Sequence, residues 1–308
     1  MKARFPALGI ALALVLECVV LGFLSPHFLT AENLLNVSLQ ASITAIIAAG
    51  MTFVILTGGI DLSVGSVVAL SGIVGTLAAK SVAGPAAPFA ALAAALAFGA
   101  LSGAIAGLVV TRFGVQPFIV TMALMTVWRG TAFVVTGGRP VWELPDSFAV
   151  LGAARPLGVP LPTWCMLAVF AVAHVVLRHV RFGRHVVAVG GNAEAARLAG
   201  IDTRRVLLAV YVTSGLLAAL SGVLMASRMN SGQPNAGQMY ELDVIAAVVV
   251  GGTSLSGGRG SIARTLLGAL LIAILKNGLN LLDVNSYVQQ VVVGVVILAA
   301  VLFDRRKD

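Results

Sequence analysis

Long apolar stretches, separated by short polar or glycine-rich segments, cover almost the whole chain. An α-helix rises 1.5 Å per residue, so about 20 apolar residues cross the hydrocarbon core of a bilayer. The pattern therefore predicts an all-α fold, a polytopic bundle of about ten transmembrane helices. The predicted spans are residues 7–24, 35–57, 63–79, 87–111, 117–136, 163–180, 206–228, 241–256, 262–282 and 287–303. The third, eighth and tenth of these are short for a full crossing.

The composition supports an integral membrane protein. Of the 308 residues, 59 % are hydrophobic and 10 % are charged, with a mean hydropathy of +1.01. Soluble domains carry about 25 % charged residues. We expect residues 1–308 to form a single transmembrane domain. The two cysteines and four histidines show no spacing typical of a disulfide framework, a metal site or a catalytic triad, so we expect no enzyme and no bound cofactor.

The positive charges mark the orientation of the chain. The net charge is +8 and the isoelectric point is near 10.3, but the basic residues lie between apolar runs, which argues against a nucleic-acid partner. With the N-terminus inside, fourteen of the twenty Lys and Arg residues fall on the inner side and four on the outer side. The positive-inside rule then predicts that both termini are cytoplasmic.

A basic segment between two spans, about residues 181–205, contains the sequence of a short helix. Asn192 suits an N-cap, Glu194 would meet the positive end of the helix, and Gly200 is a natural stop. We interpret this cytoplasmic helix of about two turns as a docking element for a partner. The alternative is a solvated loop whose charges only obey the positive-inside rule.

A glycine-rich motif occurs twice. The frame Gly-Gly-x-x-Leu-Ser-x-Gly appears at residues 58–65 and again at 251–258. Glycine-interrupted segments at matching places in two halves indicate a transport pathway. We expect both copies on the same side of the membrane, with Asp61 and Ser63 capping the helix that follows. The alternative is two ordinary turns in a chain with 34 glycines.

Small residues recur at every fourth position in one predicted span. Gly99, Gly103 and Gly107 form a stripe that would let another helix backbone approach closely. We interpret the stripe as packing within one subunit rather than between subunits.

A few polar side chains fall inside predicted spans. Arg129 could serve a function or extend to the outer surface. Near the outer end of another span, Lys276, Asn277, Asn280 and Asp283 form a polar stripe. Amide groups both donate and accept hydrogen bonds, which suits the hydroxyls of a sugar, but hydrogen bonding between helices is an alternative role.

Five segments together resemble one known family, the permease subunits of bacterial ABC importers for monosaccharides, of the ribose/xylose type. The resemblance extends from about residue 24 to residue 308. It is based on residues 25–30, 50–66, 190–201, 240–260 and 277–282, which include Gly58-Gly-Ile-Asp-Leu-Ser-Val-Gly65 and Gly190-Gly-Asn-Ala-Glu-Ala-Ala-Arg-Leu-Ala-Gly-Ile201. The chain departs from the family at Ala199, where a serine is often found.

The resemblance implies a pore in the bacterial inner membrane with several partners. These are a second permease subunit, a cytoplasmic ATP-binding subunit that carries ATP and magnesium, a periplasmic sugar-binding protein, and membrane lipid. The chain itself has no Gly-x-x-x-x-Gly-Lys-Ser/Thr motif, so hydrolysis is expected on the partner. The residues carried over to ATPase docking are Asn192, Ala193, Glu194, Ala195, Ala196, Arg197, Leu198, Ala199 and Gly200.

Six polar residues are candidates for the translocation pathway, because they lie in the repeated motif or in the polar stripe. They are Asp61, Ser63, Thr253, Ser254, Asn277 and Asn280. A secondary sugar carrier that acts without an ATPase is the alternative function. The sequence shows no pair of intramembrane carboxylates of the kind that would couple transport to protons.

Overall fold

The computed structural model describes residues 5–82 and 84–305, which form helices and connecting segments without any β-strand. The helices are α1 (Phe5–Leu24), α2 (Ala31–Leu56), α3 (Val64–Ser81), α4 (Ala87–Phe113), α5 (Pro117–Thr136), α6 (Val150–Ala153), α7 (Leu161–His179), α8 (Arg181–Gly191), α9 (Ala193–Leu198), α10 (Thr203–Met229), α11 (Tyr240–Val250), α12 (Ile262–Leu281) and α13 (Ser286–Arg305). Short 3-10 turns occupy Gly84–Ala86, Asp146–Ala149 and Pro156–Gly158.

Each predicted span overlaps a helix, and the polytopic all-α fold is confirmed. In the described part of the chain, seven helices are long and apolar enough to cross a membrane. α1 and α13 are each 20 residues long. The eighth prediction is wrong: α11 has only 11 residues and ends at Val250, because Gly251 and Gly252 begin a turn there. At 1.5 Å per residue α11 is about 16 Å long, roughly half a crossing.

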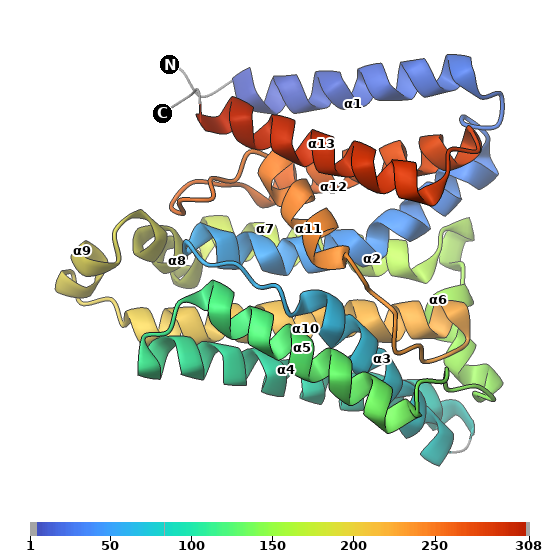
Figure 1. The fold of residues 1–308 in the computed structure, drawn as a ribbon, viewed down its shortest axis with the longest axis horizontal. Helices are drawn as coiled ribbons and strands as arrows, with labels where there is room; N and C mark the ends of the chain where they lie inside the picture. The colour runs from blue at the N-terminus through green and yellow to red at the C-terminus, as the bar shows by residue number, and fades with distance from the viewer. Residues whose placement is uncertain (1–4, 83, 306–308) are drawn as a thin grey trace.

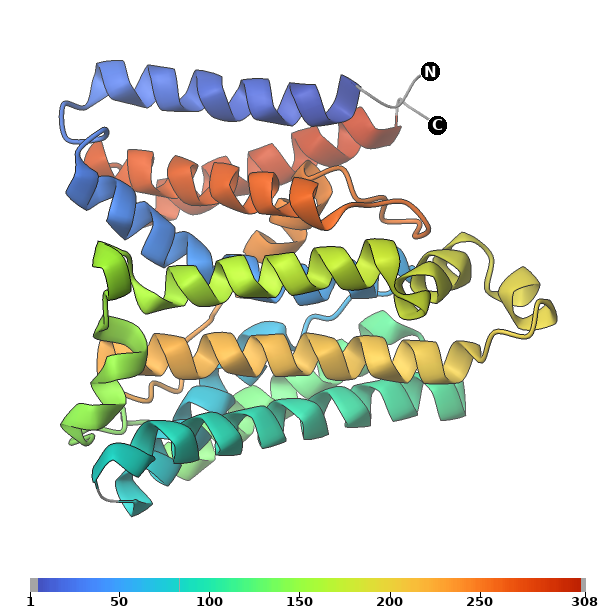
Figure 2. The same ribbon diagram turned by 180° about the vertical axis from the view of Figure 1, so that it is seen from behind.

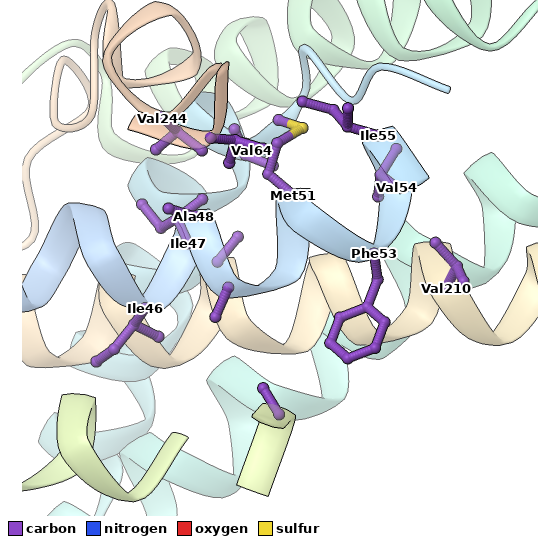
Figure 3. Packing of buried hydrophobic residues seen from close by; sticks show 14 of the residues in the cluster. Ile46, Ile47, Ala48, Met51, Phe53, Val54, Ile55, Val64, Val210 and Val244 are labelled. Carbon is purple, nitrogen blue, oxygen red and sulfur yellow. The ribbon is translucent and has the colours of Figure 1, made fainter. Parts of the chain in front are cut away.

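α2 lies at the centre of the bundle. Its sequence from Ala41 to Leu56 is apolar on all sides apart from a few hydroxyls, as expected for a helix surrounded by protein. Figure 3 shows Met51 of α2 near Val64 of α3 and Val244 of α11, while Phe53 projects the other way, toward Val210 of α10. The helices that carry the two copies of the motif are therefore packed around α2.

Two non-helical segments lie within the bundle and run in opposite directions. We call residues 57–63 the first break and residues 230–239 the second break. After α2 ends, residues 57–63 turn back toward the middle of the bundle, where α3 begins (Figure 1). After α10 ends, at the opposite end, residues 230–239 return to the middle, where α11 begins. Figure 2 shows the same arrangement from behind. This is the antiparallel relation of an inverted repeat.

The two breaks meet at the starts of α3 and α11. A Cβ atom on Gly65 would overlap the carbonyl oxygen of Gly237 and lie 2.5 Å from the Oε2 of Glu241. Gly237 has φ +64°, a conformation in which glycine carries no penalty from a side chain. Glycine at both positions therefore lets the two breaks touch in the interior.

α4 and α10 pack along the small-residue stripe. Cβ atoms on Gly99 and Gly103 would overlap the backbone of α10 at Gly215 and Tyr211, and one on Gly107 would lie 2.9 Å from the Cα of Leu208. The predicted use of the stripe for packing within one subunit is confirmed.

One end of the bundle gathers the basic segment. α8 and α9 lie there, together with the first turn of α1 and the last turn of α13 (Figure 1). We call this the basic end, and the opposite end, which carries α6, the far end. The arrangement places the beginning of α1, the end of α13 and the predicted docking helix at the same end, as the orientation predicted from charge requires.

Candidate functional site

The basic segment is more ordered than the sequence predicted. Residues 181–191 were expected to be loop, but they form α8, which directly follows α7. Val186 and Val189 are buried on one face, while Arg181 and Arg184 are exposed on the other. Phe182 packs against Phe53 of the central helix, with ring centroids 6.1 Å apart. The spacing of Phe182, Val186 and Val189 was the available signal for this helix.

The short helix predicted after Asn192 is confirmed as α9. The Oδ1 of Asn192 accepts a hydrogen bond of 2.9 Å from the backbone N–H of Ala195, and Gly200 has φ +84° at the end. Arg197 donates two hydrogen bonds to Glu194, which lower the pKa of that carboxyl group. Ala196 is buried, whereas Leu198 is 78 % exposed. Leu198 is therefore the large apolar side chain that α9 exposes.

The helix pair α8–α9 is attached to both copies of the glycine-rich motif. A Cβ atom on Gly190 would overlap the carbonyl oxygen of Leu56 and lie 2.7 Å from the backbone nitrogen of Gly258. That nitrogen donates a hydrogen bond of 2.9 Å to the same Leu56 oxygen. α8, the end of α2 and the turn after α11 are therefore in backbone contact. We call Leu56, Gly190 and Gly258 the glycine junction.

The two motif copies meet at this junction, so the prediction that they share one side is confirmed. A Cβ atom on Gly257 would lie 3.0 Å from the backbone nitrogen of Gly58. The copies are not structurally equivalent, however: the first precedes α3, whereas the second lies in the turn after α11. The counterpart of residues 57–63 in the inverted repeat is residues 230–239, which lack the motif. The pairing of the two halves inferred from the sequence is corrected accordingly.

Thr253 and Ser254 lie just beside the glycine junction. The backbone N–H of Ser254 donates to the carbonyl oxygen of Arg259 at 2.9 Å and closes the turn. Thr253 is fully buried, and a Cβ atom on Gly260 would contact its side chain at 2.7 Å. Both residues therefore belong to the tight turn that touches α2 and α8.

Asp61 connects the first break to α10. Its Oδ1 accepts hydrogen bonds from the Ser63 backbone N–H at 3.0 Å and the Ser63 Oγ at 2.6 Å. Its Oδ2 accepts a bond of 2.8 Å from the Oγ of Ser214 on α10. The predicted capping of α3 is therefore wrong for both residues: no side chain accepts from the first N–H groups of the helix, and the Ser63 hydroxyl donates to Asp61. Asp61 instead binds Ser63, the residue that precedes α3. No local pattern predicted the contact with Ser214, which lies 153 residues away in the chain.

α5 satisfies exposed carbonyl groups in both breaks. The Oγ of Thr121 lies 3.0 Å from the carbonyl oxygen of Ile60. About two turns further along α5, the Nη1 of Arg129 donates to the carbonyl oxygens of Pro234 and Ala236, each at 2.7 Å. Non-helical backbone at membrane depth needs such partners. Arg129 therefore binds the backbone of the second break and does not extend to the outer surface, while a function of Arg129 in transport stays a prediction.

We expect Arg129→Gln to weaken the fold at the second break. The glutamine side chain is too short to reach both carbonyl oxygens, and each buried carbonyl left without a partner costs about 1–3 kcal/mol. The free energy of unfolding should fall by about 2–4 kcal/mol, measured by thermal or denaturant unfolding of the purified protein. Arg139→Gln, at an exposed loop position, is the control and should leave stability unchanged. Equal stability of both variants would show that Arg129 does not hold the break.

The polar stripe on α12 makes contacts between helices. Asn277 and Asn33 of α2 exchange two amide hydrogen bonds of 2.9 and 3.0 Å. Asn280 accepts a bond of 3.0 Å from Gln289 of α13, and Lys276 forms an ion pair with Asp243 of α11. Of the two roles considered, hydrogen bonding between helices is therefore the one that is seen.

The structure brings four of the six pathway candidates together. Asp61 and Ser63 lie at the first break, and Thr253 and Ser254 lie at the turn that contacts its start. Asn277 and Asn280 lie apart from them, on α12 near the far end. A pathway role for each of the six stays a prediction.

Comparisons with known proteins place the chain among transport permeases. Residues 33–301 match the family model described as branched-chain amino acid transport system / permease component. The chain is 50 % identical over 301 residues to the ribose import permease protein RbsC of Escherichia coli (strain K12), covering 96 % of this chain and 93 % of the relative. It is 48 % identical over 303 residues to RbsC of Bacillus subtilis (strain 168), covering 98 % and 93 %. It is 39 % identical over 283 residues to the L-arabinose transport system permease protein AraH of Escherichia coli (strain K12), covering 92 % and 85 %. No solved structure matches the chain.

Proposed function

The chain belongs to the branched-chain amino acid transport system / permease component family, and from that premise we propose that it is the membrane subunit of an ATP-driven ABC importer for a monosaccharide. The relatives named for ribose and L-arabinose support a sugar substrate, a pentose, a hexose or a related polyol. The subunit is a multi-pass protein of the bacterial inner membrane. It forms a pore and does not itself catalyse a reaction.

The proposed importer contains several subunits. Two permease subunits form the pore, cytoplasmic ATP-binding subunits hydrolyse ATP with magnesium, and a periplasmic protein delivers the sugar. The basic end faces the cytoplasm, which the excess of Lys and Arg there supports. The far end then faces the periplasm and receives the loaded binding protein.

The glycine junction is the observation on which the mechanism depends. α9 docks on the ATP-binding subunit through residues 192–200, with exposed Leu198 at its tip. When the ATPase dimer closes, α8 and α9 move as a rigid body. Because Gly190 is in backbone contact with the end of α2 and with the turn at Gly258, that movement reaches both inner connections directly.

The six polar candidates are assigned to the two ends of the translocation pathway. We propose that Asp61, Ser63, Thr253 and Ser254 act at the cytoplasmic end of the pathway, where the junction could open or close it. Asn277 and Asn280 are proposed to act near its periplasmic end, where they join α12 to α2 and α13.

Leu198→Glu tests the docking role. A charge at the exposed tip should remove an apolar anchor from the interface, and anchors of this kind contribute about 2 kcal/mol or more. We expect association of the ATP-binding subunit and sugar uptake to fall at least about tenfold, as measured by co-purification and by ribose uptake. Leu157→Glu is the matched control: Leu157 is 90 % exposed at the far end, so the ATPase should still bind. If the ATP-binding subunit associates with the Leu198→Glu variant as strongly as with the wild type, α9 does not have the docking role.

The alternative of a secondary carrier is tested with the permease alone. The purified chain in proteoliposomes, under a proton or sodium gradient and without an ATPase, should not accumulate ribose. Accumulation under those conditions would overturn the proposed function.

A further inference from the structure

A cavity of about 480 Å³, with both polar and apolar side chains in its lining, lies between α11, α12 and α13. It is bounded by the end of the second break at Gln238 and Met239, by Lys276 of α12, and by the first two turns of α13 from Ser286 to Gly294. The volume falls within the range of roughly 300–1,000 Å³ that is typical of small-molecule sites. None of the six pathway candidates lines this cavity.

The wall of the cavity carries an ion pair at membrane depth. Asp243 of α11 is buried, with its side chain 8 % exposed, and it accepts a charge-assisted hydrogen bond from the Nζ of Lys276, which is 37 % exposed. Charged side chains inside a membrane are costly and usually serve a function. Since the two charges neutralise each other, the site has no net charge with which to hold an ion.

Amide side chains from the second break and from α13 line the same cavity. Gln289 uses its nitrogen for Asn280 and for the carbonyl oxygen of Val284, which leaves its oxygen as an acceptor. The side chains of Gln238 and Gln290 are exposed and make no hydrogen bond with other residues in the described part of the chain. Their amides can each donate and accept. The cavity therefore combines a paired carboxylate and ammonium with two uncommitted amides.

We propose that this cavity is a sugar-binding station that the transported monosaccharide occupies on its way through the permease. A sugar is neutral and carries several hydroxyls, each able to donate to Asp243 or an amide oxygen and to accept from Lys276 or an amide nitrogen. A phospholipid headgroup would bring an anionic phosphate to a site without net positive charge. Met239, which also lines the cavity, has φ +67°, an unfavourable backbone conformation of a kind that is common at binding sites.

The inference rests on the proposed function and adds to it the place where the permease itself contacts the sugar. The inference also assigns different roles to two neighbouring residues of α12. Asn277 holds the helix to α2, whereas Lys276, one residue earlier, faces the cavity together with Asp243. The amides that contact sugar are then on α13 and the second break, not on the polar stripe.

Gly294→Leu fills the cavity and tests the proposal. No atom lies within 4 Å of a Cβ placed on Gly294, so the leucine can enter the cavity without a backbone clash, and leucine favours the helix more than glycine does. Gly9→Leu, on exposed α1 with equally open surroundings, is the matched control. Both variants are studied as complete importers, with the ATP-binding subunit, in lipid nanodiscs, and light scattering checks that the complex is intact.

The probe is D-ribose. Without binding protein, saturation-transfer NMR should detect ribose on the wild type and on Gly9→Leu, and should lose the signal in Gly294→Leu. With binding protein, Gly294→Leu should lower uptake at least tenfold while ATPase activity remains. Gln238→Leu and Gln290→Leu should each weaken ribose binding roughly three- to tenfold, the effect of one lost hydrogen bond, and they decide the question should Gly294→Leu fail to assemble.

The outcomes separate the two proposals. If the wild-type importer takes up ribose and all three cavity variants bind and import it as the wild type does, the station is wrong and the importer function stands. If ribose, L-arabinose and D-allose are neither bound nor taken up by the wild type, the sugar-importer function itself is wrong.

Discussion

Replacing Gly190 by alanine is expected to abolish ribose uptake by the importer. The added Cβ would overlap the carbonyl oxygen of Leu56 and press on the backbone nitrogen of Gly258. Both neighbours are backbone atoms, which cannot rotate away as a side chain could. Overpacking of this kind costs about 1–3 kcal/mol, and more where nothing can shift. The least costly relief is for α8 to move away from the ends of α2 and the turn after α11, which breaks the contact that transmits movement.

Gly191→Ala is the matched control for this variant. Gly191 is the next residue of the same helix, yet no atom lies within 4 Å of its Cβ position. The two variants have the same change in helix propensity and composition and differ in the junction alone. Gly190→Ala should reduce uptake to below about a tenth of the wild-type rate, consistent with a loss above 1.4 kcal/mol, while the ATPase still co-purifies. Equal uptake by the two variants would mean that the junction does not transmit movement.

The sequence predicted the helices well because each membrane span is determined by the hydrophobicity of its own residues. A run of about 20 apolar residues identifies a span without any knowledge of its neighbours. Asn192 and Gly200 are local signals of the same kind, and they located α9 to within a residue or two. α8 was missed because its apolar face is narrow and its exposed face carries Arg181 and Arg184, which indicated a solvated loop.

The interior arrangement was harder to predict because it depends on contacts distant in sequence. The inverted repeat pairs residues 57–63 with residues 230–239, and these segments have no common motif. The glycine-rich motif that does recur, at residues 58–65 and 251–258, marks two segments that meet at the basic end but do not occupy equivalent positions in the fold. Asn33 and Ser214, the partners of Asn277 and Asp61, lie 244 and 153 residues away from them. Only the packing of α2, α10 and α12 around one another shows these pairs.

Contacts with two other helices stabilise the conformation of the first break in the interior of the bundle. Its carbonyl at Ile60 has Thr121 of α5 within hydrogen-bond distance, and Asp61 takes up the hydroxyl of Ser214. The first break is thereby hydrogen-bonded to two helices, α5 and α10. Since α10 follows directly after α9 in the chain, a displacement of the docking helix can reach Asp61 through α10 as well as through the glycine junction.

Asp61→Ala is expected to cause the second large loss of uptake. The change removes three hydrogen bonds and leaves the Ser63 N–H and the hydroxyls of Ser63 and Ser214 without their acceptor in a buried site. Hydrogen bonds to a charged group contribute about 1.5–3 kcal/mol each, but the freed hydroxyls can turn to other acceptors, so the free energy of unfolding should fall by about 2–4 kcal/mol. Ribose uptake per assembled importer should drop at least about tenfold, because α10 and the first break are no longer joined.

Asp61→Asn and Ser66→Ala separate the causes of that loss. The asparagine Oδ1 can still accept from Ser63, and its amide nitrogen can donate to the oxygen of Ser214, so this variant should keep most of the stability and uptake. Ser66 donates only to the carbonyl oxygen of Ser63, within the same helix, so its loss removes a hydroxyl from this region without cutting the tie to α10. Uptake should then rank Ser66→Ala and Asp61→Asn close to the wild type and Asp61→Ala far below. A severe loss in Asp61→Asn would instead make the negative charge itself essential and would place Asp61 on the sugar pathway, whereas full activity of Asp61→Ala would remove both roles.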